Sequence, residues 1–578
     1  MNYELAKQYM DEEKYSQAIP LLEDIVDRNL REEYYRLLND AYTRTGDTKK
    51  QEKLIKKAVK QNKDNRKYAI DLGTFYINNY NKIKGEKEYN NVLKNLTANN
   101  SEIIQTANYF SAQRLYEWAA KVYMQGRKTF NDETKYTYEL TYFYQLLGMN
   151  DKIADEYLLL LDNNPNMLSQ IEVNINNLFN RDKDDKLFEI FAERVLEQVK
   201  KHPQKKEINL LYYWLMMKEN DYESALIQAK AIDKRFNKSD GSQVYDFALT
   251  AMNNTQYKYA LQGFDYLIKQ DNDTMYRHQI LQNRLTCLYR QFTEKLHHTE
   301  KETNNLLKEY EQVFSKTGYT PQSAVVMQQY ANLLAYHLQR PQQAVDVLDS
   351  IINMRQVSGL VKAECKLTRA DIYLINGDIW QASLTYSQVD KDFKNEVIGS
   401  EAKFRNARLS YFNGDFEWAE SQADALRSST TKLIANDAME LSLLIKENID
   451  QDSSYKGLSW FSKADFLLYQ NKTEEAVLYL DSIENWFVSH PLFDEVLYKK
   501  AQIAIKENNY HKADSLLREI ILKYPYDLTA DDALMLLAQI NEEQFGNPAK
   551  AKEYYEKIII DYPSSLYISQ ARKKYKDL

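Results

Sequence analysis

A motif that returns about every 34 residues constrains the fold of this chain more than any other feature. Turns of the form (G/N)-(D/N)-x-x-x-A, such as Gly414-Asp-Phe-Glu-Trp-Ala419, end at positions 18, 51, 85, 119 and 153. Later turns end at positions 225 and 260, at 344, 382 and 419, and at 476, 513 and 551. This period predicts one supersecondary unit stacked many times, because a single unit cannot bury its apolar face alone.

Each period has the pattern of two helices joined by the turn. A small residue stands twelve positions before the end of the turn, and an aromatic or aliphatic residue follows it three positions later. Small side chains let two helices approach closely, while large side chains fill the space between them. The small positions are Ala6, Gly73, Ala107, Ala248, Ala370, Ala407, Ala464 and Ala501.

Glycine and proline are scarce, with 14 and 9 residues. The two closest glycines are Gly73 and Gly85, so the chain holds no GxGxxG, no P-loop and no GxSxG nucleophile turn. Several glycines share one slot in the repeated turn, where we expect a backbone geometry that other residues reach only with strain. These are Gly46, Gly148, Gly377, Gly414 and Gly546.

This pattern resembles the tetratricopeptide repeat, a helix–turn–helix of 34 residues with the same small and large positions. The resemblance implies an all-α fold, an α-solenoid superhelix of about 13 to 15 units. The predicted division is residues 1–165 as repeats 1 to 5, residues 166–317 as degenerate helical repeats with two clearer units at 208–270, residues 318–430 as further repeats, residues 431–456 as an extra helix and a polar loop, and residues 457–578 as C-terminal repeats.

No set of residues in the sequence indicates catalysis or metal binding. Cys287 and Cys365 are far apart and form no CxxC motif, so we expect buried thiols rather than a disulfide. His297 and His298 are adjacent, and adjacent side chains on a helix point about 100° apart, so the two cannot hold one ion. The pair Asp531-Asp532 is expected at a helix start, where acids favour the helix dipole. We therefore predict no catalytic residue, no metal and no cofactor, and a protein that is not an enzyme.

Charge narrows the class of partner. Residues 401–550 contain 16 basic and 25 acidic side chains. Such an acidic region disfavours nucleic acids and anionic lipids as partners. No apolar run reaches the 18 or more residues of a membrane span, so no transmembrane segment is expected.

The concave face of such a solenoid is lined by the first helix of each unit, and partner peptides commonly lie there. In the family, chaperone-binding members grip a C-terminal carboxylate with Lys and Asn four residues apart on that helix. The matching positions here include Leu367 with Asp371 and Phe404 with Arg408, so that type of function is not expected. The candidate partner-binding residues are the apolar Leu367, Phe404, Tyr411, Phe461 and Tyr498 and the acidic Glu364, Asp371, Glu401 and Asp465.

These candidates indicate a non-catalytic scaffold that binds partner proteins or peptides carrying exposed basic and aromatic residues. The same residues could instead contact only the neighbouring unit. A helical repeat domain that supports an enzyme activity, and a structural spacer without a groove ligand, are the alternatives.

The end of the chain carries two motifs that look like the repeats of bacterial cell-envelope proteins of this family. They are Lys523-Tyr-Pro525 and Asp561-Tyr-Pro-Ser-Ser-Leu-Tyr567. The resemblance implies the periplasm or the periphery of the outer membrane, if a leader was removed before Asn2. The alternative is a cytoplasmic protein.

Overall fold

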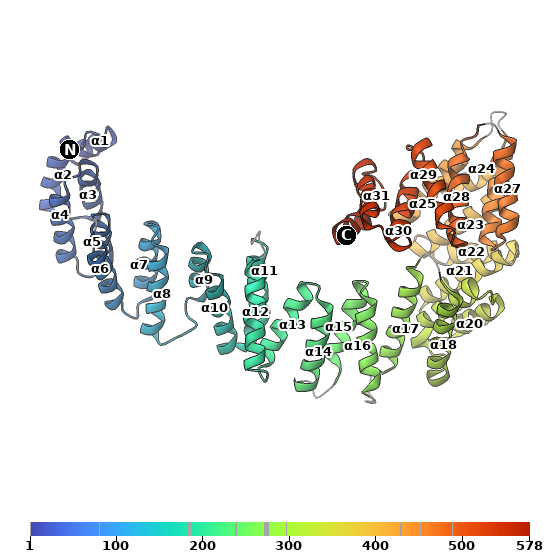
Figure 1. The fold of residues 1–578 in the computed structure, drawn as a ribbon, viewed down its shortest axis with the longest axis horizontal. Helices are drawn as coiled ribbons and strands as arrows, with labels where there is room; N and C mark the ends of the chain where they lie inside the picture. Colours follow the sequence, from blue (N-terminus) through green and yellow to red (C-terminus); the bar gives the residue numbers. More distant parts are fainter. Residues whose placement is uncertain are drawn as a thin grey trace. The chain divides into compact units, whose positions relative to one another are not determined.

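The computed structural model describes residues 2–79, 81–181, 186–236, 240–270, 277–295, 298–427, 431–449, 454–487 and 489–578. These residues form helices α1 to α32 and three short helical segments, η1 to η3, and they contain no strand (Figure 1). The predicted all-α fold of successive helix pairs is confirmed. His297 and most of the polar loop expected around 450–454 lie outside the described residues. The chain divides into two compact units, Met1–Gln243 and Val244–Leu578.

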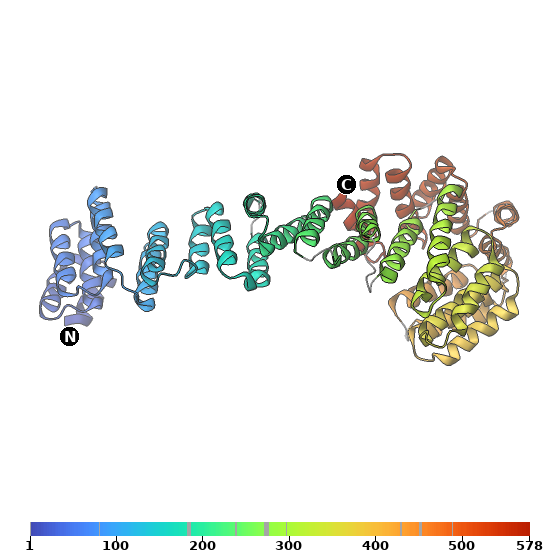
Figure 2. The ribbon, with the colours of Figure 1, turned by 90° about the horizontal axis from the view of Figure 1, so that it is seen from below.

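The first unit is a row of helix pairs in which most helices pack on the next one in the chain, while α6 also packs on α8 and α10 on α12 (Figure 2, blue to green). First helices of neighbouring pairs, such as α5 and α7, also touch. The helices are α1 (Asn2–Asp11), α2 (Tyr15–Arg28), α3 (Glu32–Thr45), α4 (Thr48–Gln61), α5 (Arg66–Asn78), α6 (Lys82–Lys94), α7 (Asn100–Ala112), α8 (Tyr116–Phe130), α9 (Thr137–Leu146), α10 (Asn150–Asn163), η1 (Pro165–Met167), α11 (Leu168–Phe179), α12 (Lys186–Lys201), α13 (Lys206–Lys218) and α14 (Tyr222–Phe236).

The second unit continues the same arrangement. Its helices are α15 (Ser242–Asn253), α16 (Tyr257–Lys269), α17 (Arg277–Thr293), α18 (Glu300–Thr317), η2 (Pro321–Ser323), α19 (Ala324–Asn332), η3 (Leu333–His337), α20 (Pro341–Asn353), α21 (Gly359–Ile375), α22 (Ile379–Asp392), α23 (Val397–Phe412), α24 (Phe416–Leu426), α25 (Lys432–Glu447), α26 (Lys456–Tyr469), α27 (Thr473–Trp486), α28 (Phe493–Lys506), α29 (Tyr510–Lys523), α30 (Ala530–Glu543), α31 (Pro548–Asp561) and α32 (Ile568–Asp577).

The geometry of the turn explains the first two positions of the repeated motif. In the described turns, the residue five positions before the end of the turn has a left-handed backbone, with φ between 52° and 86°. The five predicted glycines all adopt it, and other repeats place a different residue there: Glu13, Arg114, Asn220, Thr255, Gln339, Asn471 and Asn508. The next residue often caps the second helix, because its side chain accepts a hydrogen bond from a backbone N–H three positions on. Asp47, Asn81, Asp221, Asp378, Asn509 and Asn547 do so.

The small residues of the motif lie where the two helices of a pair come closest. Ala407 and Ala464 are fully buried, as are the other alanines at this position. A Cβ atom added to Gly73 would lie 2.4 Å from the ring of Tyr89 on the paired helix. The predicted role of the small residues in close helix packing is therefore confirmed.

Both cysteines also agree with the sequence interpretation. Cys287 and Cys365 are free and buried. Burial raises the pKa of each thiol to about 12, so both remain protonated and unreactive at neutral pH.

Helix α25 departs from the pairing in the second unit. It packs on α24 and also touches α23, whereas the next helix, α26, contacts α23 directly. Thus α26 continues the row of first helices, and α25 lies beside that row without a second helix of its own. This position lets α25 form a wall of the site described below.

The left-handed turn residue generates a prediction about stability. Gly414→Ala should lower the free energy of unfolding by about 1 kcal/mol, because alanine tolerates a φ of 85° poorly. An added Cβ would meet no atom within 4 Å there, so the effect is one of the backbone alone. Urea denaturation measures it. The matched control is Gly359→Ala in the first turn of α21, which should be neutral or slightly stabilising. Equal losses in both variants would contradict this explanation of the turn.

Candidate partner-binding cavity

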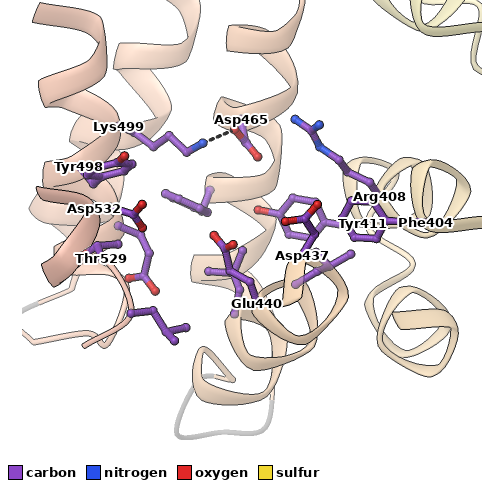
Figure 3. A pocket seen from close by; sticks show the side chains of 15 residues that line it. Phe404, Arg408, Tyr411, Asp437, Glu440, Asp465, Tyr498, Lys499, Thr529 and Asp532 are labelled. Atoms are coloured by element: carbon purple, nitrogen blue, oxygen red, sulfur yellow. Dashed lines mark ion pairs between the residues drawn. The ribbon is translucent and has the colours of Figure 1, made fainter. Parts of the chain in front are cut away.

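A cavity of about 320 Å³ opens within the second unit, among α23, α25, α26, α28 and the start of α30 (Figure 3). We call it the C-terminal cavity. It is lined by Phe404, Arg408, Tyr411, Asp437, Glu440, Leu441, Leu444, Phe461, Asp465, Glu495, Tyr498, Lys499, Leu528, Thr529 and Asp532.

Five of the nine candidate residues line this cavity: Phe404, Tyr411, Phe461, Asp465 and Tyr498. They come from three helices that are separate in the sequence. Phe404 and Tyr411 are seven residues apart on α23, and Phe461 and Asp465 are four apart on α26, so each pair shares one helix face. Stacking of the repeats aligns these helix faces. Residues at equivalent positions of different repeats therefore line the same cavity.

The four aromatic side chains form an apolar wall with graded exposure. Tyr411 and Phe461 are each 1% exposed and belong largely to the core of the unit. Phe404 and Tyr498 are half-buried, so part of each ring faces the cavity. A ligand in the cavity would therefore meet Phe404 and Tyr498 first.

The hydroxyl of Tyr411 has no hydrogen-bond partner among the described residues. Burial raises its pKa well above the ordinary value, so the phenol stays protonated. A buried hydroxyl without a partner costs free energy. Figure 3 shows it directed toward the middle of the cavity, near Asp437.

Five carboxyl groups and two cations line the cavity. Lys499 forms an ion pair of 2.8 Å with Asp465. Arg408 stacks over the rings of Phe412 and Tyr469, each 5.2 Å from its guanidinium carbon. Asp437, Glu440 and Asp532 form no ion pair within the described part of the chain, and Asp532 accepts a hydrogen bond of 2.6 Å from the hydroxyl of Tyr567.

These carboxylates disfavour one another's charge. Burial raises the pKa of Glu440, and the nearby charges of Asp532 and Asp437 raise it further. Burial also raises the pKa of Asp532, although the hydrogen bond from Tyr567 opposes this shift. The pKa of Glu495 is raised strongly by burial and by its neighbour Asp494, and its Oε2 atom has no hydrogen-bond partner.

The remaining four candidates lie outside the cavity. Leu367 is 2% exposed and belongs to the core formed by α21 to α28. Glu364 is exposed on α21. Asp371 and Glu401 both bind the guanidinium group of Arg405, which is 2.8 Å from Glu401, and Asp371 also accepts a hydrogen bond of 2.5 Å from the hydroxyl of Tyr386. Burial raises the pKa of Asp371, although the charge of Arg405 lowers it in part.

Sequence reasoning missed the residues that α25 contributes. Asp437, Glu440, Leu441 and Leu444 all line the cavity, yet α25 lacks the repeat signature and could not be aligned with the other helices. Their spacing of three or four residues was a usable signal, because it places them on one helix face. Asp532, interpreted from its place at a helix start, also faces the cavity (Figure 3).

Two further properties concern the whole described chain. In the described ranges, no group of three or more His, Cys, Asp or Glu side chains is placed to hold a metal ion. Among the same residues, we found no helix with the length and hydropathy needed to cross a membrane.

Comparison with known proteins finds a family whose repeat matches two C-terminal segments. Residues 495–525 and 532–565 match the tetratricopeptide repeat, which confirms the predicted resemblance. No curated protein matches the sequence.

Several solved structures are similar to parts of this chain. A tetratricopeptide repeat protein from Parabacteroides merdae is 12% identical over 52% of this chain and 98% of its own, with a TM-score of 0.29. Yeast Tom70 is 14% identical over 77% and 94%, with a TM-score of 0.30. The C-terminal part of a repeat protein from Cytophaga hutchinsonii is 14% identical over 50% and 99%, with a TM-score of 0.26. These TM-scores are far below 0.5, so the likenesses inform neither the arrangement nor the partners of this chain.

The ion pairs of Arg405 predict that Asp371 contributes to the stability of the fold. Arg405→Met should lower the free energy of unfolding by about 2 to 3 kcal/mol, because it leaves the carboxylate of Asp371 largely buried and without its cation. Arg427→Met is the control, since its ion pair with Asp424 is more exposed and should contribute less than about 1 kcal/mol. Chemical denaturation of both variants checks the difference. A similar loss of unfolding free energy in both variants would show that Arg405 does not stabilise the buried carboxylate of Asp371.

Proposed function

We propose that this chain, whose C-terminal helix pairs are tetratricopeptide repeats, is a non-catalytic scaffold that holds a basic and aromatic segment of a partner protein in the C-terminal cavity. Repeat folds of this kind present extended concave surfaces to other proteins. Our proposal is more specific than this general property, because it assigns the binding to the C-terminal cavity of the second unit.

The meeting of Phe404, Tyr411, Phe461, Asp465 and Tyr498 in one open cavity is the observation that carries the proposal. The repeat pattern alone predicts that these residues lie on the faces of first helices that are turned toward a ligand. Partly exposed rings such as those of Phe404 and Tyr498 are suited to anchor an aromatic or aliphatic side chain.

The charge of the cavity supports a basic ligand. Its carboxyl groups outnumber its cations, and Lys499 is already paired with Asp465. The acidic excess of residues 401–550 surrounds the cavity with a field of the same sign. Such a field accelerates the approach of a positively charged segment and repels nucleic acid.

Site-specific crosslinking tests the proposal on the full-length protein. A photo-reactive amino acid at position 404 should capture the partner, whereas the same group at Trp380, which is 77% exposed on α22 outside the cavity, should not. With the partner identified, Phe404→Ala should weaken binding about tenfold, mainly through faster dissociation. Trp380→Ala is the matched control and should leave the dissociation constant unchanged.

The outcome that contradicts the proposal is also defined. If Phe404 only fills the core, Phe404→Ala lowers the melting temperature and leaves the affinity of the folded protein unchanged. Capture of the partner from position 380 with equal efficiency would place the interface elsewhere.

The proposed setting is a bacterial cell envelope, on the resemblance of the repeats around Lys523-Tyr-Pro525 and residues 561–567 to those of envelope proteins. Fractionation of cells that express the protein from its own gene checks this placement. We expect it in the periplasmic or outer-membrane fraction. Recovery with the cytoplasmic fraction would favour the alternative.

A further inference from the structure

We infer that the C-terminal cavity contains a subsite for one cationic side chain, in which the carboxylates of Asp437, Glu440 and Asp532 and the hydroxyl of Tyr411 receive an ammonium or guanidinium group carried on an aliphatic stem. This inference rests on the proposed function, because it specifies which part of the partner enters the cavity. We call these four residues the cation subsite.

The carboxylates of the cation subsite have no cation partner among the described residues, although Asp532 accepts a hydrogen bond from the hydroxyl of Tyr567. Asp437 and Glu440 form no ion pair with any described residue, and the hydroxyl of Tyr411 is buried without a hydrogen bond. Buried polar groups are normally satisfied, so an orphaned hydroxyl on a cavity wall points to a group that the ligand supplies. Figure 3 shows the carboxylates and the hydroxyl directed toward the same space.

The walls of the cavity favour an organic cation over a metal ion. In the described ranges, no group of three or more His, Cys, Asp or Glu side chains has an arrangement that could hold a metal ion. Phe404 and Tyr498 instead offer ring surface beside the carboxylates. A lysine or arginine side chain matches both features, because its aliphatic stem packs on apolar surface while its charged end reaches the acids.

Every element around Glu440 contributes a charged or titratable group. They are Asp437 on α25, Arg408 and Tyr411 on α23, Asp465 on α26, Glu495 and Lys499 on α28, and Asp531 and Asp532 on α30. The pKa of Glu440 is raised by burial and then by Asp532 and Asp437, so like-charge repulsion destabilises the unoccupied cavity at neutral pH. A bound cation relieves this repulsion, and protonation of Glu440 removes the attraction. Cation binding should therefore weaken as the pH falls.

Dansylcadaverine is a suitable probe, since it joins an aromatic group to a primary ammonium through an alkyl stem. Its N-acetylated form has nearly the same shape without the charge. Fluorescence titration of the full-length protein should show the charged probe binding at least about tenfold more tightly than the acetylated form at pH 7, and less tightly at pH 5. A dansylated alkylguanidine in a parallel titration distinguishes an arginine subsite from a lysine subsite, and preference for either cation supports the inference.

Two variants locate the binding. Glu440→Gln should remove most of the preference for the charged probe, whereas Glu475→Gln, an exposed acid on α27 outside the cavity, should leave it intact. Tyr411→Phe should weaken the charged probe several-fold without lowering the melting temperature, because it deletes a hydroxyl that the free protein leaves unsatisfied. A residue with only a structural role would lower the melting temperature when changed.

Equal affinity for the charged and acetylated probes, or a preference that survives Glu440→Gln, overturns the cation subsite. Crosslinking from position 404 and the effect of Phe404→Ala on the partner do not depend on this result. If the probe fails while those experiments succeed, the proposed function stands and the subsite falls. If the probe binds as expected while the partner is insensitive to Phe404→Ala, the subsite stands and the proposed function falls.

Discussion

The close contact between the two helices of a repeat is the interaction on which the rest of the structure depends. A fully buried alanine or a glycine stands at the crossing point, and an aromatic or aliphatic residue fills the space beside it. The connecting turn keeps this contact in register, because one residue adopts a left-handed backbone and the next caps the second helix. Each pair then buries its remaining apolar face against its neighbours, so stability is distributed along the row rather than held in one centre.

Regular stacking aligns the faces of the first helices, and that alignment creates a surface for binding. In the second unit it brings α23, α26 and α28 together, with their aromatic side chains turned to one side. Helix α25 interrupts the regular order and lies beside this row. The interruption converts an open surface into a walled cavity, and it adds two carboxylates that no described cation neutralises.

Six acids of the second unit fall into two groups with different physical roles. Asp371, Glu401 and Asp465 are held by Arg405 or Lys499, and such ion pairs contribute to the stability and geometry of the helices that carry them. Asp437, Glu440 and Asp532 have no such cation, and they repel one another in a partly buried space. This repulsion costs free energy in the free protein, which is consistent with carboxylates arranged for a ligand. Many functional sites contain titratable groups with shifted pKa values.

The sequence by itself determined the repeat, the all-α fold, the slot of the left-handed turn residue and the burial of the small residues, because each of these depends on contacts within one repeat and its immediate neighbours. Spacing alone also predicted which helix faces could meet a partner, and five of the nine residues predicted in this way line the C-terminal cavity. Only the tertiary structure decided which acids are paired and which are free, since Asp371 meets Arg405 from another repeat. The tertiary structure alone placed α25 against the cavity. This helix lacks the repeat signature, so its sequence could not be aligned with the other helices. Its position follows from packing against α23 and α24.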